Sequence, residues 1–155
     1  MKQPTFEFFP FDTIKGEEID LLIERKVPGN VDKNYVPAYW YAINLSGTNL
    51  TIGTIDLRIG TNSRTYYGGN IGYAIDTKYR GNHYAAKACQ LLKQVALAHG
   101  MHEIIITCNP DNIASNKTCI RLGAELLEVV DLPIDNDMYL EGEFQKCIYN
   151  WRISS

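Results

Sequence analysis

The N-terminal part of the chain combines scattered aromatic residues with a stretch of helical periodicity. Residues 1–15 contain two prolines and alternating phenylalanines, which predicts an irregular segment or a short edge strand with apolar anchors. From Gly16 to Lys26, apolar residues return every three or four positions with charges between them. We therefore predict an amphipathic helix there that ends near Pro28-Gly29. The apolar anchors are Phe6, Phe8 and Phe11, and the helical positions are Ile19, Leu22 and Ile23.

Two more helices are predicted in the middle of the chain. Tyr84–His99 carries one apolar stripe with lysine and glutamine outside it, and Gly100 is well placed to end the helix. The next helix can be capped by Asp111 or Asn112 and runs to Leu122, just before a glycine.

Short runs of aromatic and β-branched residues predict strands. The turn at residues 46–49 joins the first two strands into a hairpin. Glu103–Cys108 (EIIITC) is typical of a strand buried on both faces after a helical crossover, so we expect it to run parallel to Ile71–Ile75. The predicted strands are Tyr35–Asn44, Leu50–Ile59, Ile71–Ile75, Glu103–Cys108, Glu125–Asp131 and Lys146–Ile153.

One face of the strand Leu50–Ile59 carries charged residues, which either meet solvent or line a cleft. We expect solvent. We predict that Thr61–Asn70 is a loop or a hairpin turn. Residues 132–144 are predicted to form an acidic loop. Because successive side chains of a strand point to opposite faces, one face carries the apolar residues Ile55, Leu57 and Ile59. The other face carries Thr54, Asp56 and Arg58.

Length and composition predict one α+β domain over residues 1–155, with one parallel strand pair. The net charge of −3 argues against a nucleic-acid partner, and no apolar run approaches the roughly 20 residues of a membrane helix. The first 18 residues contain two prolines and turn acidic, so we do not expect a signal peptide. The cysteines have no metal-ligand spacing, which favours buried reduced thiols in a cytoplasmic protein without a metal; they are Cys89, Cys108, Cys119 and Cys147.

Polar residues gather at two turns within the segment Ile71–Ala124, which has the order strand, turn, helix, strand, turn, helix. The first turn, Asp76–His83, leads directly into a helix, whose unpaired N–H groups and partial positive charge suit an anion. The second turn, at residues 109–115 (NPDNIAS), opens another helix close to the first. Two such turns suit one elongated ligand with a phosphate end and a reactive end.

The residues of both turns resemble motifs of the GNAT superfamily of acyl-CoA N-acyltransferases. Residues 80–85, Arg-Gly-Asn-His-Tyr-Ala, match its phosphate-binding signature, with His83 at a position that is usually glycine. The sequence Asn112-Ile113-Ala114-Ser115 and the helix that ends in Arg121-Leu122-Gly123-Ala124 match a second block. Ala124 replaces its usual phenylalanine. The second block is most similar to the branch with ribosomal-protein N-terminal acetyltransferases.

This resemblance implies a mixed, mostly antiparallel sheet in which the parallel strands Ile71–Ile75 and Glu103–Cys108 splay apart, flanked by helices. Acetyl-CoA would be the co-substrate, with its pantetheine along the main chain of the first strand and its pyrophosphate on N–H groups at the helix start. Gly81 could instead be only a turn residue with positive φ, and Asn112 only a helix cap. The implied contacts are Tyr73, Ile75, Arg80, Gly81, Asn82, His83, Tyr84, Ala85, Ala86, Asn112 and Ser115.

The resemblance further implies direct attack of a neutral amine on the thioester. Many relatives protonate the leaving thiolate with a tyrosine, whose position here is Cys119; we expect Ser115 to serve and Cys119 to be a small buried residue. A glutamate base of some relatives aligns with Thr107, which cannot act as one. Asp76, Asp56, Tyr73 and water-mediated proton loss all stay open.

The predicted function is therefore an N-acetyltransferase for a primary amine, either a small molecule or a peptide N-terminus. The alternative is a weakly catalytic acyl-CoA-binding module, since His83 and the missing tyrosine depart from the family pattern. A homodimer is possible, whereas nucleic acid and membranes are not expected as partners. Acceptor contacts should come from the variable segments Gly16–Tyr35, Thr61–Gly69 and Leu132–Lys146.

Overall fold

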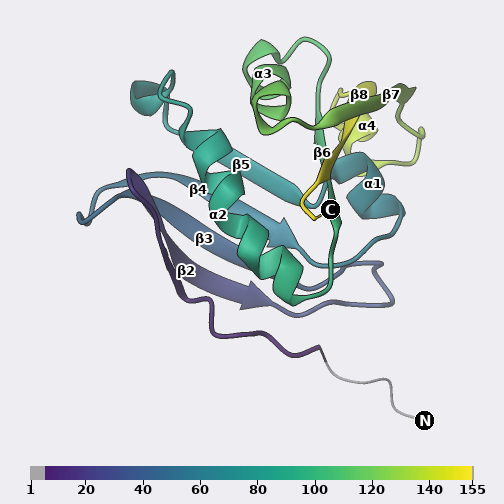
Figure 1. Cartoon of the computed structure of the whole chain (residues 1–155). Coiled ribbons are helices and arrows are strands. Elements are labelled where there is room, and N and C mark those ends of the chain that lie inside the picture. Colours follow the sequence, from purple (N-terminus) through teal and green to yellow (C-terminus); the bar gives the residue numbers. More distant parts are fainter. Residues whose placement is uncertain (1–5, 155) are drawn as a thin grey trace.

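The computed structural model describes residues 6–154 and contains two antiparallel sheets that meet at an angle (Figure 1). The five-stranded sheet has the order β1-β2-β3-β4-β5, and the three-stranded sheet has the order β6-β8-β7. The strands of the large sheet are β1 (Thr13–Lys15), β2 (Ile19–Val27), β3 (Ala38–Leu45), β4 (Thr51–Arg58) and β5 (Ile71–Ile75). Those of the small sheet are β6 (Glu103–Cys108), β7 (Glu125–Asp131) and β8 (Gln145–Arg152).

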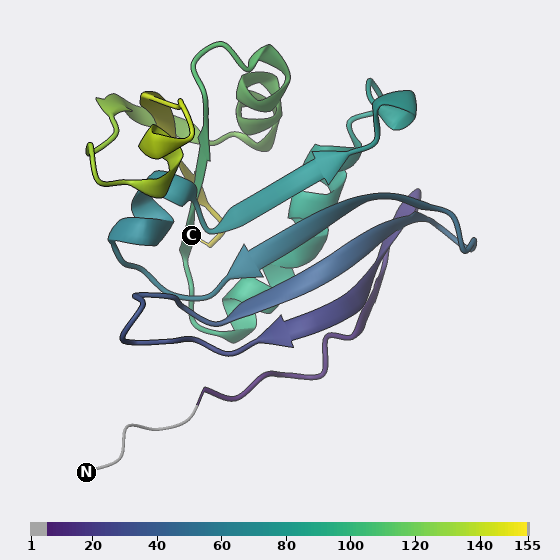
Figure 2. The same cartoon turned by 180° about the vertical axis from the view of Figure 1, so that it is seen from behind.

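The helices lie against and between the two sheets. The long helix α2 (Tyr84–Ala98) crosses one face of the large sheet, as Figures 1 and 2 show from opposite sides. The remaining helical elements are α1 (Ser63–Gly68), the 3₁₀ turn η1 (Thr77–Tyr79), α3 (Ile113–Leu122) and the short α4 (Asp137–Leu140).

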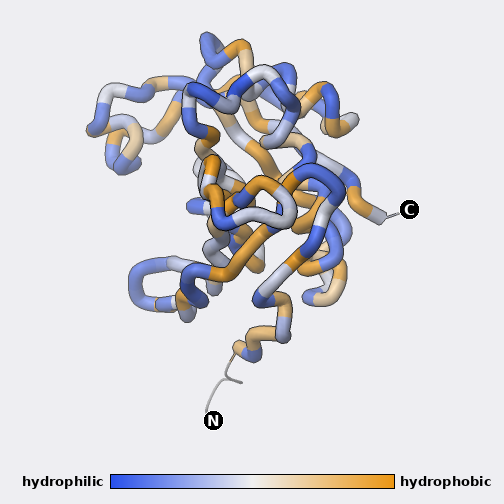
Figure 3. The backbone as a smooth tube through the Cα atoms, turned by 90° about the vertical axis from the view of Figure 1, so that its left-hand side faces the viewer, coloured by the Kyte–Doolittle hydropathy of each residue, from blue (hydrophilic) through white to orange (hydrophobic). Residues whose placement is uncertain are grey.

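The core forms between α2 and the inward face of the large sheet. Tyr39, Tyr41 and Ile43 alternate along β3 and are fully buried, as are Leu92 and Val95 on α2. Hydrophobic positions run through these central elements, while hydrophilic positions dominate the outer loops (Figure 3). Burial of a large apolar side chain stabilises the fold by about 1.5–3 kcal/mol, so this layer holds α2 on the sheet.

The strands β5 and β6, predicted to be a splayed parallel pair, touch at one end and then diverge (Figure 2). The Asn70 backbone N–H donates to the Ile105 carbonyl (2.7 Å), and the Ile105 N–H donates to Asn70 Oδ1 (2.8 Å). Beyond this contact, no strand pairing joins β5 to β6 among residues 6–154. The predicted single mixed sheet is therefore two antiparallel sheets linked at Asn70.

Three local predictions are wrong. The segment Gly16–Lys26 is not a helix but contains most of β2, because Ile19 and Leu21 alternate into the core and pair with β3. The segment Thr61–Asn70 contains α1, which Asn62 begins through a reciprocal capping box with Thr65. The acidic loop likewise contains α4.

The expectation of solvent for the polar face of β4 holds for Thr54 but fails for Asp56. Thr54 is exposed, whereas Asp56 is only 4% exposed and forms an ion pair with Arg58 (2.9 Å). A buried carboxylate is costly unless a charge or hydrogen bonds compensate it. Arg58, two residues along the same strand face, supplies that charge.

His99 fastens the N-terminal segment to the end of α2. Its ring lies between the rings of Phe6 and Phe9, with centroid distances of 4.8 and 4.4 Å. Tyr39 Oη lies 2.7 Å from His99 Nε2 and accepts a hydrogen bond from the Phe9 N–H (2.8 Å). When His99 is neutral and its Nε2 carries no proton, that nitrogen can accept a hydrogen bond from the Tyr39 hydroxyl. Burial lowers the pKa of His99, which favours this neutral form.

We expect the free energy of unfolding to decrease as the pH falls below about 6.5, the pKa of an unfolded histidine. The folded pKa of His99 is lowered, so its contribution is fully present above the unfolded pKa and is lost as the pH falls through the folded pKa. Denaturant titrations between pH 7.5 and 5 measure this slope. His99→Gln should flatten it, whereas His102→Gln, at an exposed position, should leave it unchanged. An unchanged slope in His99→Gln would contradict the assignment.

Candidate functional site

The outer edge of β5 is free to accept an extended ligand. Arg58 N–H donates to the Asn70 carbonyl (2.7 Å) and Asp76 N–H donates to the Ile52 carbonyl (2.8 Å), so the even-numbered residues of this segment face β4. In an antiparallel pair, the backbone groups of the alternate residues point away from the partner. The N–H and C=O groups of Tyr73 and Ile75 therefore point into the space between β5 and β6.

Arg80 lies where this free edge ends. Its Nε donates to the Ile75 carbonyl (2.9 Å), which holds the exposed side chain beside the turn. Asn82 Nδ2 donates to the Tyr79 carbonyl (3.0 Å) and closes the same turn. A ligand that pairs with the Ile75 carbonyl must displace the Arg80 contact, which would release the guanidinium for an anion.

The turn before α2 has two residues in left-handed conformations. Gly81 has φ of 90°, and no atom lies within 4 Å of the position that a Cβ would occupy. His83 has φ of 62° and ψ of 23°, a conformation that favours glycine. The departure from the family motif at His83 thus falls on a backbone position where glycine would carry no strain.

The start of α2 offers backbone N–H groups to an anion. No side chain of residues 6–154 caps this helix start, and its first turn contains no acidic residue. The first N–H groups of a helix lack partners within the helix, so those of Tyr84, Ala85 and Ala86 are donors at its positive end. Ala85 is half-buried and Ala86 is buried, while Gly81, Asn82 and His83 are exposed. The backbone here is approachable, as the phosphate hypothesis requires.

A hydrogen bond between side chains crosses from β5 to α3. Tyr73 Oη donates to Ser115 Oγ at 3.1 Å. Asn112 caps α3, since its Oδ1 accepts from the Ser115 N–H (3.1 Å). Asn112 is thus a helix cap, whether or not it also contacts a ligand, and the cap holds the backbone that carries Ser115.

The Tyr73 hydroxyl is a hydrogen-bond donor at this position. Burial raises its pKa, against the opposing effect of hydrogen bonds with Ser115 and Thr118, so its hydroxyl is protonated at neutral pH. Because Ser115 Oγ accepts the tyrosine proton, its own hydroxyl proton is free to point elsewhere. The sequence points to Tyr73 both for its main-chain groups and as a candidate base. Because residues alternate along β5, its side chain lies on the opposite face from Gly72 and reaches Ser115 on α3.

Cys119 has the environment of a core residue. Its side chain is fully buried, and a hydrogen bond with Cys108 together with burial raises its pKa. This agrees with the interpretation of Cys119 as a small buried residue. Thr107, at the position of the glutamate in some relatives, donates to the Tyr67 carbonyl (3.0 Å).

The carboxylates considered as bases have different surroundings. Asp76 is exposed at the end of β5. Asp56 is buried on the outer face of β4, where burial raises its pKa despite the nearby Arg58 and Arg25. In addition, Arg58 Nη1 donates to the carbonyls of Gly68 and Gly69, both at 3.1 Å, so this side chain links the carboxylate to the turn before β5.

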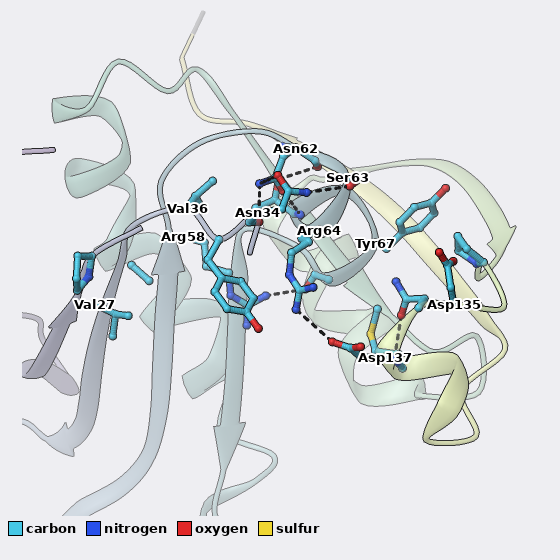
Figure 4. Close-up of a pocket in the computed structure, with 18 of the residues that line it drawn as sticks. Val27, Asn34, Val36, Arg58, Asn62, Ser63, Arg64, Tyr67, Asp135 and Asp137 are labelled. Carbon is cyan, nitrogen blue, oxygen red and sulfur yellow. Dashed lines mark hydrogen bonds and ion pairs between the residues drawn. The ribbon is translucent and has the colours of Figure 1, made fainter. Parts of the chain in front are cut away.

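A cavity of about 710 Å³ lies on the outer side of β3 and β4 (Figure 4). It is lined by parts of all three segments in which acceptor contacts were expected. Arg64 joins these segments, because it forms an ion pair with Asp137 (3.3 Å) and its guanidinium lies 4.4 Å from the ring centre of Tyr35. Arg58 and Trp40 extend the cavity wall onto the sheet itself.

The part of the chain that the structure describes contains neither a metal-binding cluster nor a membrane-crossing helix. Among residues 6–154, no group of three or more His, Cys, Asp or Glu side chains could hold a metal ion. In the same range, no helix is long and apolar enough to cross a membrane.

Comparisons with known proteins bear on this geometry. Residues 1–125 match the model of the acetyltransferase (GNAT) domain. The chain is 24% identical to the uncharacterized N-acetyltransferase YnaD of Bacillus subtilis over 143 residues, covering 92% of this chain and 70% of the relative.

Two solved structures have similar folds. Ribosomal-protein-S5-alanine acetyltransferase from Vibrio fischeri superposes with a TM-score of 0.64 at 14% identity, over 90% of this chain and 96% of that chain. Microcin C7 self immunity acetyltransferase MccE, in complex with acetyl-CoA and AMP, gives a TM-score of 0.57 at 22% identity, over 74% of this chain and 61% of that chain. From the family match over most of its length and these likenesses in fold, the chain belongs to the GNAT acetyltransferase family.

Proposed function

We propose that this protein transfers the acetyl group of acetyl-CoA to a primary amine by direct attack within a ternary complex. The observation that carries the proposal is the opening between β5 and β6, with a free strand edge on one side and the Tyr73–Ser115 hydrogen bond across it. MccE is described in complex with acetyl-CoA, and the Vibrio fischeri protein as an acetyltransferase for a ribosomal-protein alanine. The first description supports acetyl-CoA as co-substrate, and the second supports the amine of an amino acid as acceptor.

In this proposal, acetyl-CoA lies along β5 as an added strand. Its pyrophosphate rests on the N–H groups at the start of α2, near Gly81 and Arg80. Its pantetheine pairs with the outward main-chain groups of Ile75 and Tyr73. The thioester then lies at the inner end of the strand, near Tyr73 and Ser115.

The chemistry needs positioning and proton transfer. A neutral amine attacks the carbonyl carbon, a C–N bond forms, and the C–S bond breaks to release the thiolate of CoA. Ser115 donates its hydroxyl proton to the leaving sulfur and is reprotonated from Tyr73, which regains a proton from solvent. A thiolate with an ordinary pKa near 8.5 leaves readily, so this donor accelerates the reaction without being indispensable.

We expect saturable binding of acetyl-CoA and no comparable binding of NAD or ATP. The free edge of β5 and the uncapped start of α2 suit a pantetheine with a pyrophosphate, and the sequence has no glycine motif for a dinucleotide or nucleotide. Isothermal titration calorimetry with the three compounds measures this. Binding of NAD without binding of acetyl-CoA would refute the proposed function.

Gly81→Val should weaken acetyl-CoA binding by at least about tenfold, because a branched side chain keeps the phosphate from the amides. The substitution also imposes positive-φ strain of order 1–2 kcal/mol. Gly100→Val is a matched control for that strain: Gly100 follows the other end of α2 with φ of 79°, and no atom lies within 4 Å of its Cβ position. Equal losses of affinity in both variants would place the phosphate elsewhere.

Ser115→Ala should lower kcat by about 10- to 100-fold while the acetyl-CoA dissociation constant changes little. The hydroxyl acts as charge develops on sulfur, and alanine preserves helix propensity. CoA release with the most reactive amine of a primary-amine panel gives kcat, and calorimetry gives binding. Cys119→Ala, one helical turn further on, should be nearly neutral in rate. If Cys119→Ala were slow and Ser115→Ala fully active, Cys119 rather than Ser115 would be the proton donor to the thiolate.

A further inference from the structure

Asp56 is a buried carboxylate that structural needs alone do not explain. It lies in the middle of β4, directly opposite Trp40 on β3 and Gly72 on β5. Only 4% of the residue is exposed. Burying a charge costs free energy, and an apolar residue at such a site is often at least as stabilising as an ion pair. A carboxylate kept here despite that cost is a candidate for chemistry.

The charges that face Asp56 come from two strands. Arg58 Nε pairs with Asp56 Oδ2 at 2.9 Å from the same strand. Arg25 on β2 adds a second positive charge and lies over the ring of Trp40, 4.6 Å from its centre. The neighbours opposite Asp56 on β3 and β5, Trp40 and Gly72, carry no charge. Burial outweighs both arginines and raises the pKa of Asp56, which brings this carboxylate closer to the proton affinity of an effective base.

The Asp56 carboxylate and the Arg58 guanidinium lie over Gly72, the residue opposite Asp56 on β5. A Cβ at Gly72 would lie only 2.8 Å from Asp56 Oδ1 and 3.2 Å from an Arg58 nitrogen, so the carboxylate extends over this residue. Any side chain at this position would displace it. Glycine at position 72 therefore lets the Asp56 carboxylate reach across β5 towards the space where the thioester is proposed to lie.

The distances needed for attack of an amine on the thioester, with Asp56 as the proton acceptor, fit this arrangement. A strand-like ligand on the free edge lies about 4.8 Å from β5. An amine nitrogen lies about 2.9 Å from a carboxylate that accepts its proton and about 3–3.5 Å from the carbon that it attacks. These two distances together exceed the strand spacing, so one nitrogen between the carboxylate over Gly72 and the ligand strand can contact both groups.

The cavity supplies the approach for that amine. Trp40 and Arg58, the neighbours of Asp56 on the same sheet face, belong to its wall. The carboxylates of Asp135 and Asp137 line the opposite part (Figure 4); Asp137 pairs with Arg64, which leaves Asp135 as the carboxylate that a cationic group could meet. Successive residues in a strand point to opposite faces, so Gly72 lies on the sheet face of Trp40 and Arg58, which line the cavity, whereas Tyr73 points to Ser115. Nucleophile and leaving-group donor thus approach the thioester from opposite sides of β5.

We propose that Asp56 is the general base of the transfer, which accepts a proton from the acceptor amine as that amine attacks across Gly72. This inference rests on the proposed acetyl transfer. The amine nitrogen forms its bond to the acetyl carbon and gives one proton to the Asp56 carboxylate. The C–S bond breaks, the sulfur receives its proton from Ser115, and Asp56 returns its proton to solvent. The net products are the acetamide and CoA.

The test compares Asp56→Asn with the wild-type enzyme. CoA release is followed at saturating acetyl-CoA with tyramine, spermidine and an alanine-initiated tetrapeptide, between pH 5.5 and 9. For the most reactive amine, Asp56→Asn should lose at least about 100-fold in kcat, within the range of general base catalysis. Its acetyl-CoA dissociation constant should stay within about twofold. The wild-type kcat should fall towards low pH, and that acid limb should be absent from the residual rate of Asp56→Asn.

The companion change Asp76→Asn tests the other candidate carboxylate. Retention of the wild-type rate and acid limb in Asp56→Asn would overturn the assignment of the base, as would a loss confined to Asp76→Asn. Binding of acetyl-CoA without transfer to any of the three amines would overturn the proposed function together with this assignment. Circular dichroism and a melting curve show whether Asp56→Asn is folded. If it is not, Gly72→Ala, which displaces the carboxylate from β5, should reproduce the rate loss, and full activity in Gly72→Ala would overturn the proposal.

Discussion

The hydrogen bonds of Asn70 determine how the two sheets of this protein meet. Its backbone N–H, which would ordinarily pair with β4, donates to the Ile105 carbonyl on β6. The side-chain amide supplies the missing hydrogen bond to β4, since Nδ2 donates to the carbonyls of Arg58 and Gly60 (3.1 and 2.8 Å). The residue is 1% exposed, and leaving a buried polar group unsatisfied costs about 1–3 kcal/mol. One asparagine thus makes hydrogen bonds to both sheets at the point from which β5 and β6 diverge.

The divergence creates a site because an unpaired strand edge needs partners. Beyond Asn70, the outward N–H and C=O groups of β5 do not pair with β6 among residues 6–154, and the Ile75 carbonyl accepts from Arg80 Nε instead. The edge runs from this junction to the turn before α2, so it connects the positive end of a helix with the Tyr73–Ser115 contact. A ligand with a phosphate at one end and a pairing amide chain in the middle would satisfy the whole length. Closing the gap between β5 and β6 would remove that capacity, which is why the packing at Asn70 matters for function.

Sequence patterns predicted the central segment well because its signals are local. The bounds of β5, β6 and β7 match their predicted ranges, and α2 differs by one residue at its end. The helix predicted at Gly16–Lys26 failed because Ile19, Leu22 and Ile23 fit helical spacing, while pairing with β3 decides the conformation in context. The burial of Asp56 could not be read from the sequence, since it depends on a glycine in another strand. The Tyr73–Ser115 hydrogen bond likewise joins residues 42 positions apart.

In the proposed mechanism, the two sides of β5 separate the two proton transfers that amide formation requires. On the α3 side, Tyr73 and Ser115 are neutral hydroxyl groups, and burial raises the pKa of Tyr73, so this pair can give a proton but holds no charge to attract one. On the outer side, Asp56 is an acceptor whose affinity for a proton burial increases. A base and an acid in direct contact would exchange their proton with each other. With a strand between them, the amine and thioester of the proposed reaction would connect the two groups, and proton loss at nitrogen would be tied to proton gain at sulfur.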